Sequence, residues 1–431
     1  MTENKLNPLS KLFQVGGMEG KIVHDGIHGS MKISGVILDL VKTPEFQRLR
    51  HIKQLGLAYL VYPGANHTRF EHSLGAWNVA KRLSGELNLE KDEGLILEIA
   101  ALLHDIGHGP FSHTFESIYQ HYVKEHDHMH LGQDIILGKI DITDGNGGGR
   151  IPGILEENGI SPEEVSSLIL GKHPKRYLGQ ALHGDVDVDQ IDYLIRDAHY
   201  TGVAHGIIDM ERLLKVLTVH NGELVVEEKG LEAVEGMMVA RSLMYSRVYF
   251  HHTVKIAEGM LTRALEFALE EGNLWDFWKM VDCRVLVELE DLEGFPSEIV
   301  KRIKYRDLYK AAVLESAESL DQEEKRTLLS AYRDVKKRQE IERALADAVG
   351  AKEGEVILEF SVADLMLSEP RLKATEIGVL LENGDVQPLA KVTPLANALK
   401  RRQTPRWAVM IASPAKYVSA LRGVWKRVIF G

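Results

Sequence analysis

The sequence predicts a mainly α-helical protein: a helical bundle with small β-hairpins, followed by a smaller C-terminal α+β unit. Apolar residues recur at helical spacing through most of the first 290 residues. Short β-type runs interrupt them, as on either side of Asn221-Gly222, a dipeptide typical of hairpin turns. From about residue 290, charged helical stretches are followed by several strand-like runs. We therefore expect two domains, residues 1–290 and residues 291–431.

Local signals predict the elements in chain order. Glycine-broken β-type runs in residues 21–38 indicate a small hairpin, and Thr43 is a typical N-cap for a helix that starts at Pro44 and runs to residue 55. Residues 141–153 are expected to form a flexible loop or mobile lid. Further helices are predicted at residues 66–83, 92–103, after the capping box 161–164, at 185–200, at 231–257 and at 306–350. Strands are predicted at residues 356–362, 378–389 and 407–412, with a last helix from Ser413-Pro414.

Composition and charge limit the classes of function. Apolar content of 44% and charged content of 27% are those of a globular protein, and no apolar run is long enough for a membrane span. The single Cys283 excludes an internal disulfide framework and cysteine-ligated zinc, and it fits a reducing cytoplasm. A net charge of −11 argues against a nucleic-acid partner, so an anionic substrate needs a local basic pocket.

Residues 101–113, ALLHDIGHGPFSH, carry the strongest chemical signal. The pair His104-Asp105 closes an apolar run, and His108 and His113 follow after helix-breaking glycines. Imidazole and carboxylate together suit a divalent ion of intermediate softness such as Mn, Fe, Ni or Zn. Adjacent helical residues point about 100° apart, so both members of the pair can bind one ion only at a helix end that faces a cavity. The alternative is a capped, exposed helix end.

Residues 185–200 give the second signal. Asp189, Tyr193, Arg196 and Asp197 share one helical face, and apolar residues occupy the other side. Side chains of this kind are unsuited to packing in a hydrophobic core, so the stripe indicates that this face lines a functional site. The alternative is an exposed charged face. His, His, Asp and Asp ligands from separate helices leave coordination positions open for phosphate or water. Neither a Walker-type phosphate loop nor a serine nucleophile motif is present, which argues against kinase, ATPase and acyl-transfer chemistry.

Three motifs in order resemble one known family. HTRFEHSLG, HDIGHGPFSH and DVDQIDYLIRDAHYTG, with TPEFQRLRHIKQLG before them, are similar to the HD-domain phosphohydrolases. The match is to their deoxynucleoside triphosphate triphosphohydrolase branch, which includes an animal enzyme with a SAM domain, and it runs from about residue 21 to residue 252. We expect an HD-domain helical bundle without a SAM domain.

The resemblance implies a site. The implied metal ligands are His72, His104, Asp105 and Asp189, for a divalent ion that would be Mn, Fe, Ni, Zn or Mg. Arg69 would hold the α-phosphate, His113 would act at the phosphorus, and His108 would contact the phosphates. The implied sugar and triphosphate contacts are Gln54, Tyr193, Asp197, Arg241 and Tyr249, in a pocket that prefers a missing 2′-hydroxyl.

The general acid implied by the resemblance is His128, which would protonate the leaving ribose oxygen. Glu116 would orient a histidine. The segment around His128 is rich in histidine, and His126 or His130 could serve instead.

The sequence also departs from the family pattern. A phosphate-contacting lysine is replaced by Gln190 and a later histidine by Tyr245, and Lys42 stands where the animal enzyme has a guanine-reading aspartate. Because lysine only donates hydrogen bonds, activation by a guanine nucleotide there is not expected. The expected function is hydrolysis of deoxynucleoside triphosphates by a homo-oligomer, a dimer or tetramer. The alternatives are an HD nucleotidase or phosphodiesterase and a non-catalytic nucleotide sensor.

Overall fold

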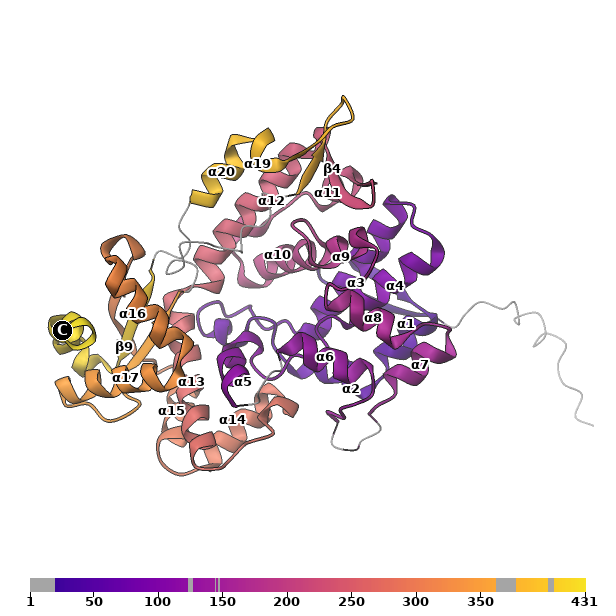
Figure 1. Ribbon diagram of the computed structural model, residues 1–431. Helices are drawn as coiled ribbons and strands as arrows, with labels where there is room; N and C mark the ends of the chain where they lie inside the picture. Colours follow the sequence, from indigo (N-terminus) through magenta and orange to yellow (C-terminus); the bar gives the residue numbers. More distant parts are fainter. Residues whose placement is uncertain (1–19, 123–126, 144, 146–147, 362–376, 402–406) are drawn as a thin grey trace, which may run out of the picture.

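The computed structural model describes residues 20–122, 127–143, 145, 148–361, 377–401 and 407–431. It confirms the mainly α-helical class with small sheets (Figure 1). Among the described residues, no helix has both the length and the apolar character needed to cross a membrane.

The first part of the chain is a helical bundle that opens with a β-hairpin. The antiparallel strands β1 (Lys21–Asp25) and β2 (Gly29–Ile33) form the predicted hairpin. α3 (Arg69–Glu86) lies between α4 (Lys91–Leu103) and α10 (Val188–Thr201), and all three helices contribute residues to the first core. The other helices of this part are α1 (Gly35–Val41), α2 (Pro44–Arg48), α5 (Glu116–Tyr122), α6 (His128–Ile136), α7 (Ile151–Glu157), α8 (Pro162–Ile169), α9 (Arg176–His183) and α11 (Met210–Val216).

Two predicted helices are shorter than expected. Thr43 caps α2 by accepting a hydrogen bond from the Phe46 N–H group, but the helix ends at Arg48 and tightens into a 3₁₀ turn, Leu49–His51. The predicted helix 231–257 is two helices, α12 (Leu231–Met244) and α13 (His252–Glu270). A π-helical turn, Tyr245–Tyr249, separates them. Such widened turns often occur at functional sites, and this one brings Tyr249 to Asp197.

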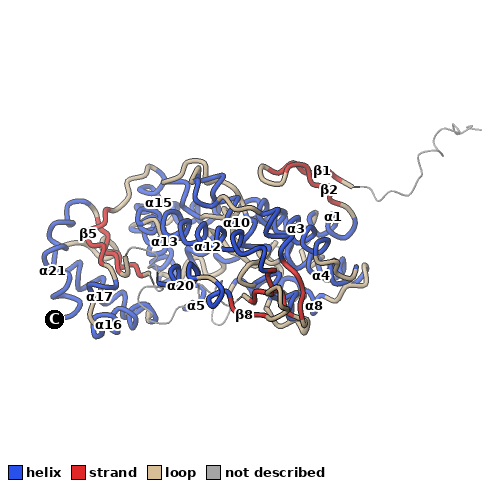
Figure 2. The backbone as a smooth tube through the Cα atoms, turned by 90° about the horizontal axis from the view of Figure 1, so that it is seen from above, coloured by secondary structure: helices blue, strands red, loops and turns tan. Residues whose placement is uncertain are grey.

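The C-terminal part contains a second sheet and a strand that the sequence analysis did not predict. β5 (Lys310–Glu315) lies within the stretch predicted to be helical and pairs with β9 (Val409–Ser413), which also pairs with β6 (Ile357–Phe360). Figure 2 shows β5 and the β1–β2 hairpin near opposite ends of the molecule. The helices of this part are α14 (Asp282–Asp291), α15 (Phe295–Lys304), α16 (Gln322–Arg333), α17 (Val335–Val349) and α21 (Val418–Phe430).

Residues 377–401 return to the first part of the molecule. β7 (Gly378–Leu380) pairs in parallel with β4 (Glu223–Glu227), in a sheet of order β3-β4-β7-β8. Ile377, Val379 and Leu389 belong to the first core. The domain boundary at residue 290 stays a prediction. Residues 377–401 lie after this boundary but pack in the core formed by residues before it. The remaining elements are β3 (Leu217–His220), β8 (Val386–Pro388), α19 (Leu389–Val392) and α20 (Pro394–Arg401).

Candidate metal centre and its surroundings

Three predicted metal ligands converge from three helices. His72 lies in α3, His104 caps the end of α4, and Asp189 lies in the first turn of α10. The His72 Nε2 atom is 3.0 Å from Asp189 Oδ1 and 3.3 Å from His104 Nε2, and His104 Nε2 is 3.6 Å from the same Asp189 oxygen. Both histidines are buried, whereas the Asp189 side chain is 28% exposed. The three side chains can therefore bind one ion that is accessible from one side.

The outer hydrogen bonds of the two histidines fit a metal centre. His104 Nδ1 lies 2.8 Å from the Ala101 carbonyl oxygen, which can only accept, so this nitrogen carries the proton. His72 Nδ1 lies 2.8 Å from Asp192 Oδ2. With a metal bound, both Nε2 lone pairs would be directed at the centre, which is the usual arrangement of metal-binding histidines. Two imidazole nitrogens and a carboxylate suit the divalent transition metals.

Asp105, the fourth predicted ligand, lies at the edge of this group. Its Oδ2 atom accepts a hydrogen bond from Arg69 at 2.5 Å and is 3.7 Å from His72 Nε2. Its Oδ1 atom is 3.3 Å from Nε2 of both His104 and His108. Asp105 thus connects the candidate ligands to Arg69 and His108, two predicted phosphate contacts.

The electrostatics of this group favour a cation. Burial opposes the charged form of His72, but hydrogen bonds with Asp189 and Asp192 and the charge of Asp105 raise its pKa to about 10. Burial acts against ionisation of Asp105 too, yet the charges of Arg69 and His104 hold its pKa well below the usual range. The carboxylates therefore stay ionised at neutral pH, and either protons on the histidines or a metal ion must balance them.

Three predicted histidines form a second group beside the first. The His108 and His128 rings stack with centroids 4.0 Å apart, and the His113 ring is 5.1 Å from His108 and 5.8 Å from His128. Burial, followed by the charge of Arg69, holds the pKa of His108 well below its usual value, so this ring is neutral at pH 7. Gly107 makes the approach of α6 possible, because a Cβ atom there would lie 2.1 Å from the His128 carbonyl oxygen.

The structure separates the candidates for the general acid. His128 packs against His108 and His113, whereas the exposed His130 pairs with Asp127 at 2.7 Å. His126 and the side chain of Glu116 lie outside the described residues.

The predicted sugar contacts gather around Asp197. Its two carboxylate oxygens lie 2.6 Å from the Tyr249 hydroxyl and 2.8 Å from His67 Nε2, and the Tyr193 and Tyr249 ring centroids are 6.1 Å apart. The buried Gln54 Oε1 atom has no hydrogen-bond partner among the described residues, which leaves it available to a ligand. Arg241 extends over the Tyr245 ring at 5.7 Å.

Gln190 does not replace the family lysine as a donor directed at phosphate. Its side-chain amide donates to Asp187 Oδ2 at 2.7 Å and to the Gly184 carbonyl oxygen at 2.9 Å. Gln190 is thus engaged with the loop that precedes α10.

Arg196 does not line the site, although the predicted stripe on α10 includes it. The stripe is not an exposed face, because Arg196 and Asp197 are buried. Arg196 donates to Asp192, at 2.8 and 2.9 Å, and to Asp25 of the hairpin, at 2.8 Å. It therefore braces α10 against β1 rather than lining the site.

Sequence analysis did not assign a role to Asp192 or His28. His28 Nε2 lies 2.6 Å from Asp192 Oδ1, whose carboxylate also contacts His72 and Arg196. Gly75 leaves room for this carboxylate, since a Cβ atom there would lie 2.0 Å from Asp192 Oδ1. The spacing of Asp189 and Asp192 could have suggested Asp192, but no local signal marks His28, which lies 164 residues from it.

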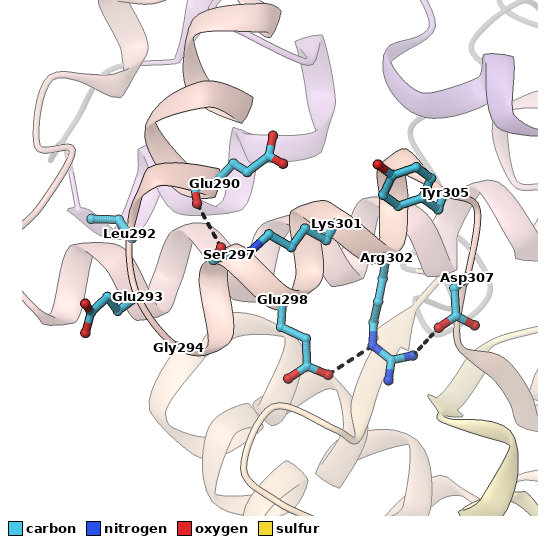
Figure 3. A pocket seen from close by; sticks show the side chains of 10 residues that line it. All are labelled: Glu290, Leu292, Glu293, Gly294, Ser297, Glu298, Lys301, Arg302, Tyr305 and Asp307. Atoms are coloured by element: carbon cyan, nitrogen blue, oxygen red, sulfur yellow. Dashed lines mark hydrogen bonds and ion pairs between the residues drawn. The ribbon is translucent and has the colours of Figure 1, made fainter.

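An open hollow of about 770 Å³ lies between α14 and α15 (Figure 3). Three of the charged residues that line it pair with one another: Arg302 contacts Glu298 at 3.1 Å and Asp307 at 2.8 Å. None of the predicted site residues lines it.

Two protein families match the chain. The HD domain matches residues 69–197, which include all four predicted metal ligands. The family described as HD associated region matches residues 208–429.

Individual relatives extend these matches. The chain is 33% identical over 412 residues to an uncharacterised protein of Methanocaldococcus jannaschii, covering 93% of this chain and 81% of that protein. It is 28% identical to the human deoxynucleoside triphosphate triphosphohydrolase SAMHD1, covering 71% of this chain and 57% of the human protein. The solved structure of a phosphohydrolase from Bacteroides thetaiotaomicron matches with a TM-score of 0.71 at 25% identity, covering 91% of this chain and 99% of that one.

Proposed function

Because this chain belongs to the HD-domain phosphohydrolases, we propose that it hydrolyses deoxynucleoside triphosphates to deoxynucleoside and inorganic triphosphate. The observation that carries this proposal is the contact between two groups. The convergent nitrogens of His72 and His104 lie beside the rings of His108, His113 and His128, and Asp105 joins the two groups. The human relative is a deoxynucleoside triphosphate triphosphohydrolase, which supports the choice of substrate.

Each group has a role in the proposed reaction. His72, His104, Asp189 and Asp105 would hold a divalent ion, which when bound supplies Lewis-acid chemistry at a phosphate oxygen. Arg69 neutralises charge on the α-phosphate, and His113 contacts the phosphoryl group as a water attacks the phosphorus and loses a proton to solvent. The bond between the α-phosphorus and the ribose 5′-oxygen breaks, and His128 gives its proton to that oxygen.

The sugar is held on the other side of the centre. His67 and Tyr249 fix the carboxylate of Asp197, which would accept a hydrogen bond from a ribose hydroxyl. Tyr193 and the side-chain oxygen of Gln54, which has no partner in the part of the chain that the structure describes, would complete the pocket, and Arg241 would contact the phosphates. We further propose a cytoplasmic homo-oligomer, a dimer or tetramer.

A second candidate function follows from Gln190. Because its amide is engaged with Asp187 and Gly184, the site has one cationic phosphate contact fewer than the family pattern. This favours a substrate with fewer negative charges, so the alternative is a nucleotidase or phosphodiesterase for monophosphates or cyclic nucleotides.

A substrate panel tests both functions. The purified protein would first be analysed for bound metal, then incubated with each dNTP, rNTP, dNMP and cyclic nucleotide, with and without a second nucleotide. Ion-exchange chromatography should show deoxynucleoside and inorganic triphosphate from dNTPs. Release of single phosphates, or turnover of monophosphates alone, would favour the second candidate, and binding without turnover would indicate a sensor. Asp189→Asn serves as the inactive control.

A further inference from the structure

The loop that carries His108 and His113 contains an unusual backbone. Phe111 and Ser112 have φ angles of 57° and 54°, in the left-handed region that residues other than glycine rarely adopt. Two such residues in succession persist only where surrounding contacts impose the conformation. They directly precede His113, so their conformation determines where that ring lies.

Ser112 connects this turn to the candidate site. Its hydroxyl donates to the Lys53 carbonyl oxygen at 2.7 Å and accepts from Arg69 Nε at 2.9 Å. Arg69 in turn donates to Asp105. A displacement of the turn would therefore move Arg69 as well as His113.

Asp282, the first residue of α14, holds the turn from a distant part of the chain. Its side chain is buried, with Oδ1 accepting from the Phe111 N–H group at 2.7 Å and Oδ2 accepting from the Lys53 N–H group at 2.9 Å. These partners lie 171 and 229 residues away in sequence. Both carboxylate oxygens thus bind the backbone that surrounds Ser112.

Arg48 holds the other end of the same loop. Its guanidinium group donates to the His108 carbonyl oxygen at 2.7 Å. The same group donates to three successive carbonyl oxygens just before Asp282, those of Trp278, Lys279 and Met280. The segment 278–282 is therefore fastened to the histidine loop both at His108 and at Phe111.

We infer that Asp282 and Arg48 are positioning residues that fix residues 108–113 in the geometry required for hydrolysis. Neither is needed to touch the substrate, because they act through His108, His113 and Arg69. The inference rests on the proposed function and extends it: the region that follows the HD domain contributes to the chemistry through this brace.

The test is the Asp282→Asn variant, which keeps the side-chain volume but replaces one acceptor by a donor facing a backbone N–H group. We expect kcat to fall by at least about ten-fold, with KM changed less than about three-fold, because small misplacements of catalytic groups are costly. Bound metal should equal that of the wild type. Hydrogen exchange should accelerate in peptides that contain Phe111. Asp276→Asn, a change of the same chemistry at an exposed carboxylate in the preceding segment, should behave like the wild type.

Two results would overturn the inference: unchanged kcat, or unchanged exchange around Phe111. If Asp282→Asn does not fold by circular dichroism, Arg48→Lys is the second variant, because lysine keeps the charge but cannot reach four carbonyl oxygens. The same two criteria then apply to it. If the wild type hydrolyses no nucleotide, the proposed function fails and exchange around Phe111 alone decides whether the brace exists.

Discussion

Two buried charged clusters in this protein differ in how their charges are balanced. The cluster around α17 joins two guanidinium groups to three carboxylates, those of Arg263, Arg338, Glu266, Glu342 and Glu359. Arg263 donates to both Glu342 oxygens at 2.7 to 3.1 Å, and Arg338 donates to Glu266 at 2.5 Å. The candidate metal centre instead brings carboxylates together with two imidazole Nε2 atoms that face one another.

The comparison separates a structural cluster from a functional one. Each carboxylate of the α17 cluster contacts a guanidinium group, and Glu342 also accepts from the Leu358 N–H group. In the candidate metal centre, protons on the histidines or a bound ion must balance the carboxylates, and the Asp189 side chain remains partly exposed. The carboxylates of the α17 cluster have guanidinium partners within the protein, so this cluster stabilises packing between α13, α17 and β6. The candidate metal centre still needs a cation to balance its carboxylates, so it is suited to binding one. The following predictions test this distinction.

The largest effect is expected from His104→Ala. Removing one of the few protein ligands should release the metal and abolish hydrolysis. The loss should be larger than the decrease of about 10–100-fold in metal affinity or activity that follows the loss of an outer hydrogen-bond partner. Metal analysis by mass spectrometry and a dNTP assay would check it, with Asp105→Ala in parallel. Full metal occupancy in both variants would show that the ligand assignment is wrong.

His128→Ala should separate chemistry from binding. Loss of the general acid is expected to lower kcat by about 10²–10⁴-fold while metal content and nucleotide affinity stay unchanged. The matched control is His130→Ala, because His130 is exposed and pairs with Asp127. If His130→Ala is the inactive variant, the role belongs to His130 instead.

Glu342→Ala should give the opposite pattern. Removing this carboxylate leaves Arg263 buried without its main partner, which typically costs about 3–5 kcal/mol of unfolding free energy. Metal content and the kcat of the folded protein should remain at wild-type values. Urea unfolding and a dNTP assay on the same preparation measure both quantities. Loss of metal in this variant would contradict the separation of the two clusters.

Asp192→Asn should weaken the metal centre without removing a ligand. Its carboxylate binds His72 Nδ1, so its loss is expected to lower metal affinity by about 10–100-fold. Competition with a chelator measures the affinity, and excess metal should restore much of the activity. An unaltered affinity would mean that Asp192 only braces the hairpin.

Asp282 offers a smaller test, because it is a buried carboxylate outside both clusters. Burial raises its pKa to about 6, while its backbone hydrogen bonds and the charges of Lys53 and Arg48 only partly oppose this. The folded state therefore retains the proton to higher pH than the unfolded chain, so its contribution to stability falls as pH rises through 6. Between pH 5 and 7 the wild type should lose about 1 kcal/mol relative to Asp282→Asn. Urea titrations of both proteins at several pH values would measure this difference. Equal pH dependence in the two proteins would show that the pKa of Asp282 is not raised.

Local signals predicted much of the fold, and the resemblance to a family supplied the candidate ligand set, which stays a prediction. The cap at Thr43, the hairpin at Asn221-Gly222 and the helices that carry His72, His104 and Asp189 follow from neighbouring residues. β5 was missed because its six residues lie among charged, helix-forming segments. The contacts of His28 and Asp282 were missed because their partners are more than 160 residues away, a distance at which no spacing rule applies.

The parallel pairing of β7 with β4 has a consequence for how the protein is made. A ribosome synthesises the chain from its first residue, and β4 emerges about 150 residues before its partner strand. The first core includes Leu389 and Leu399, so it is complete only after almost the whole chain has been translated. Until then an unpaired strand edge and part of an apolar face stay open, which are the features that chaperones bind and that promote aggregation. Late completion of the first core is therefore a consequence of the order of the chain.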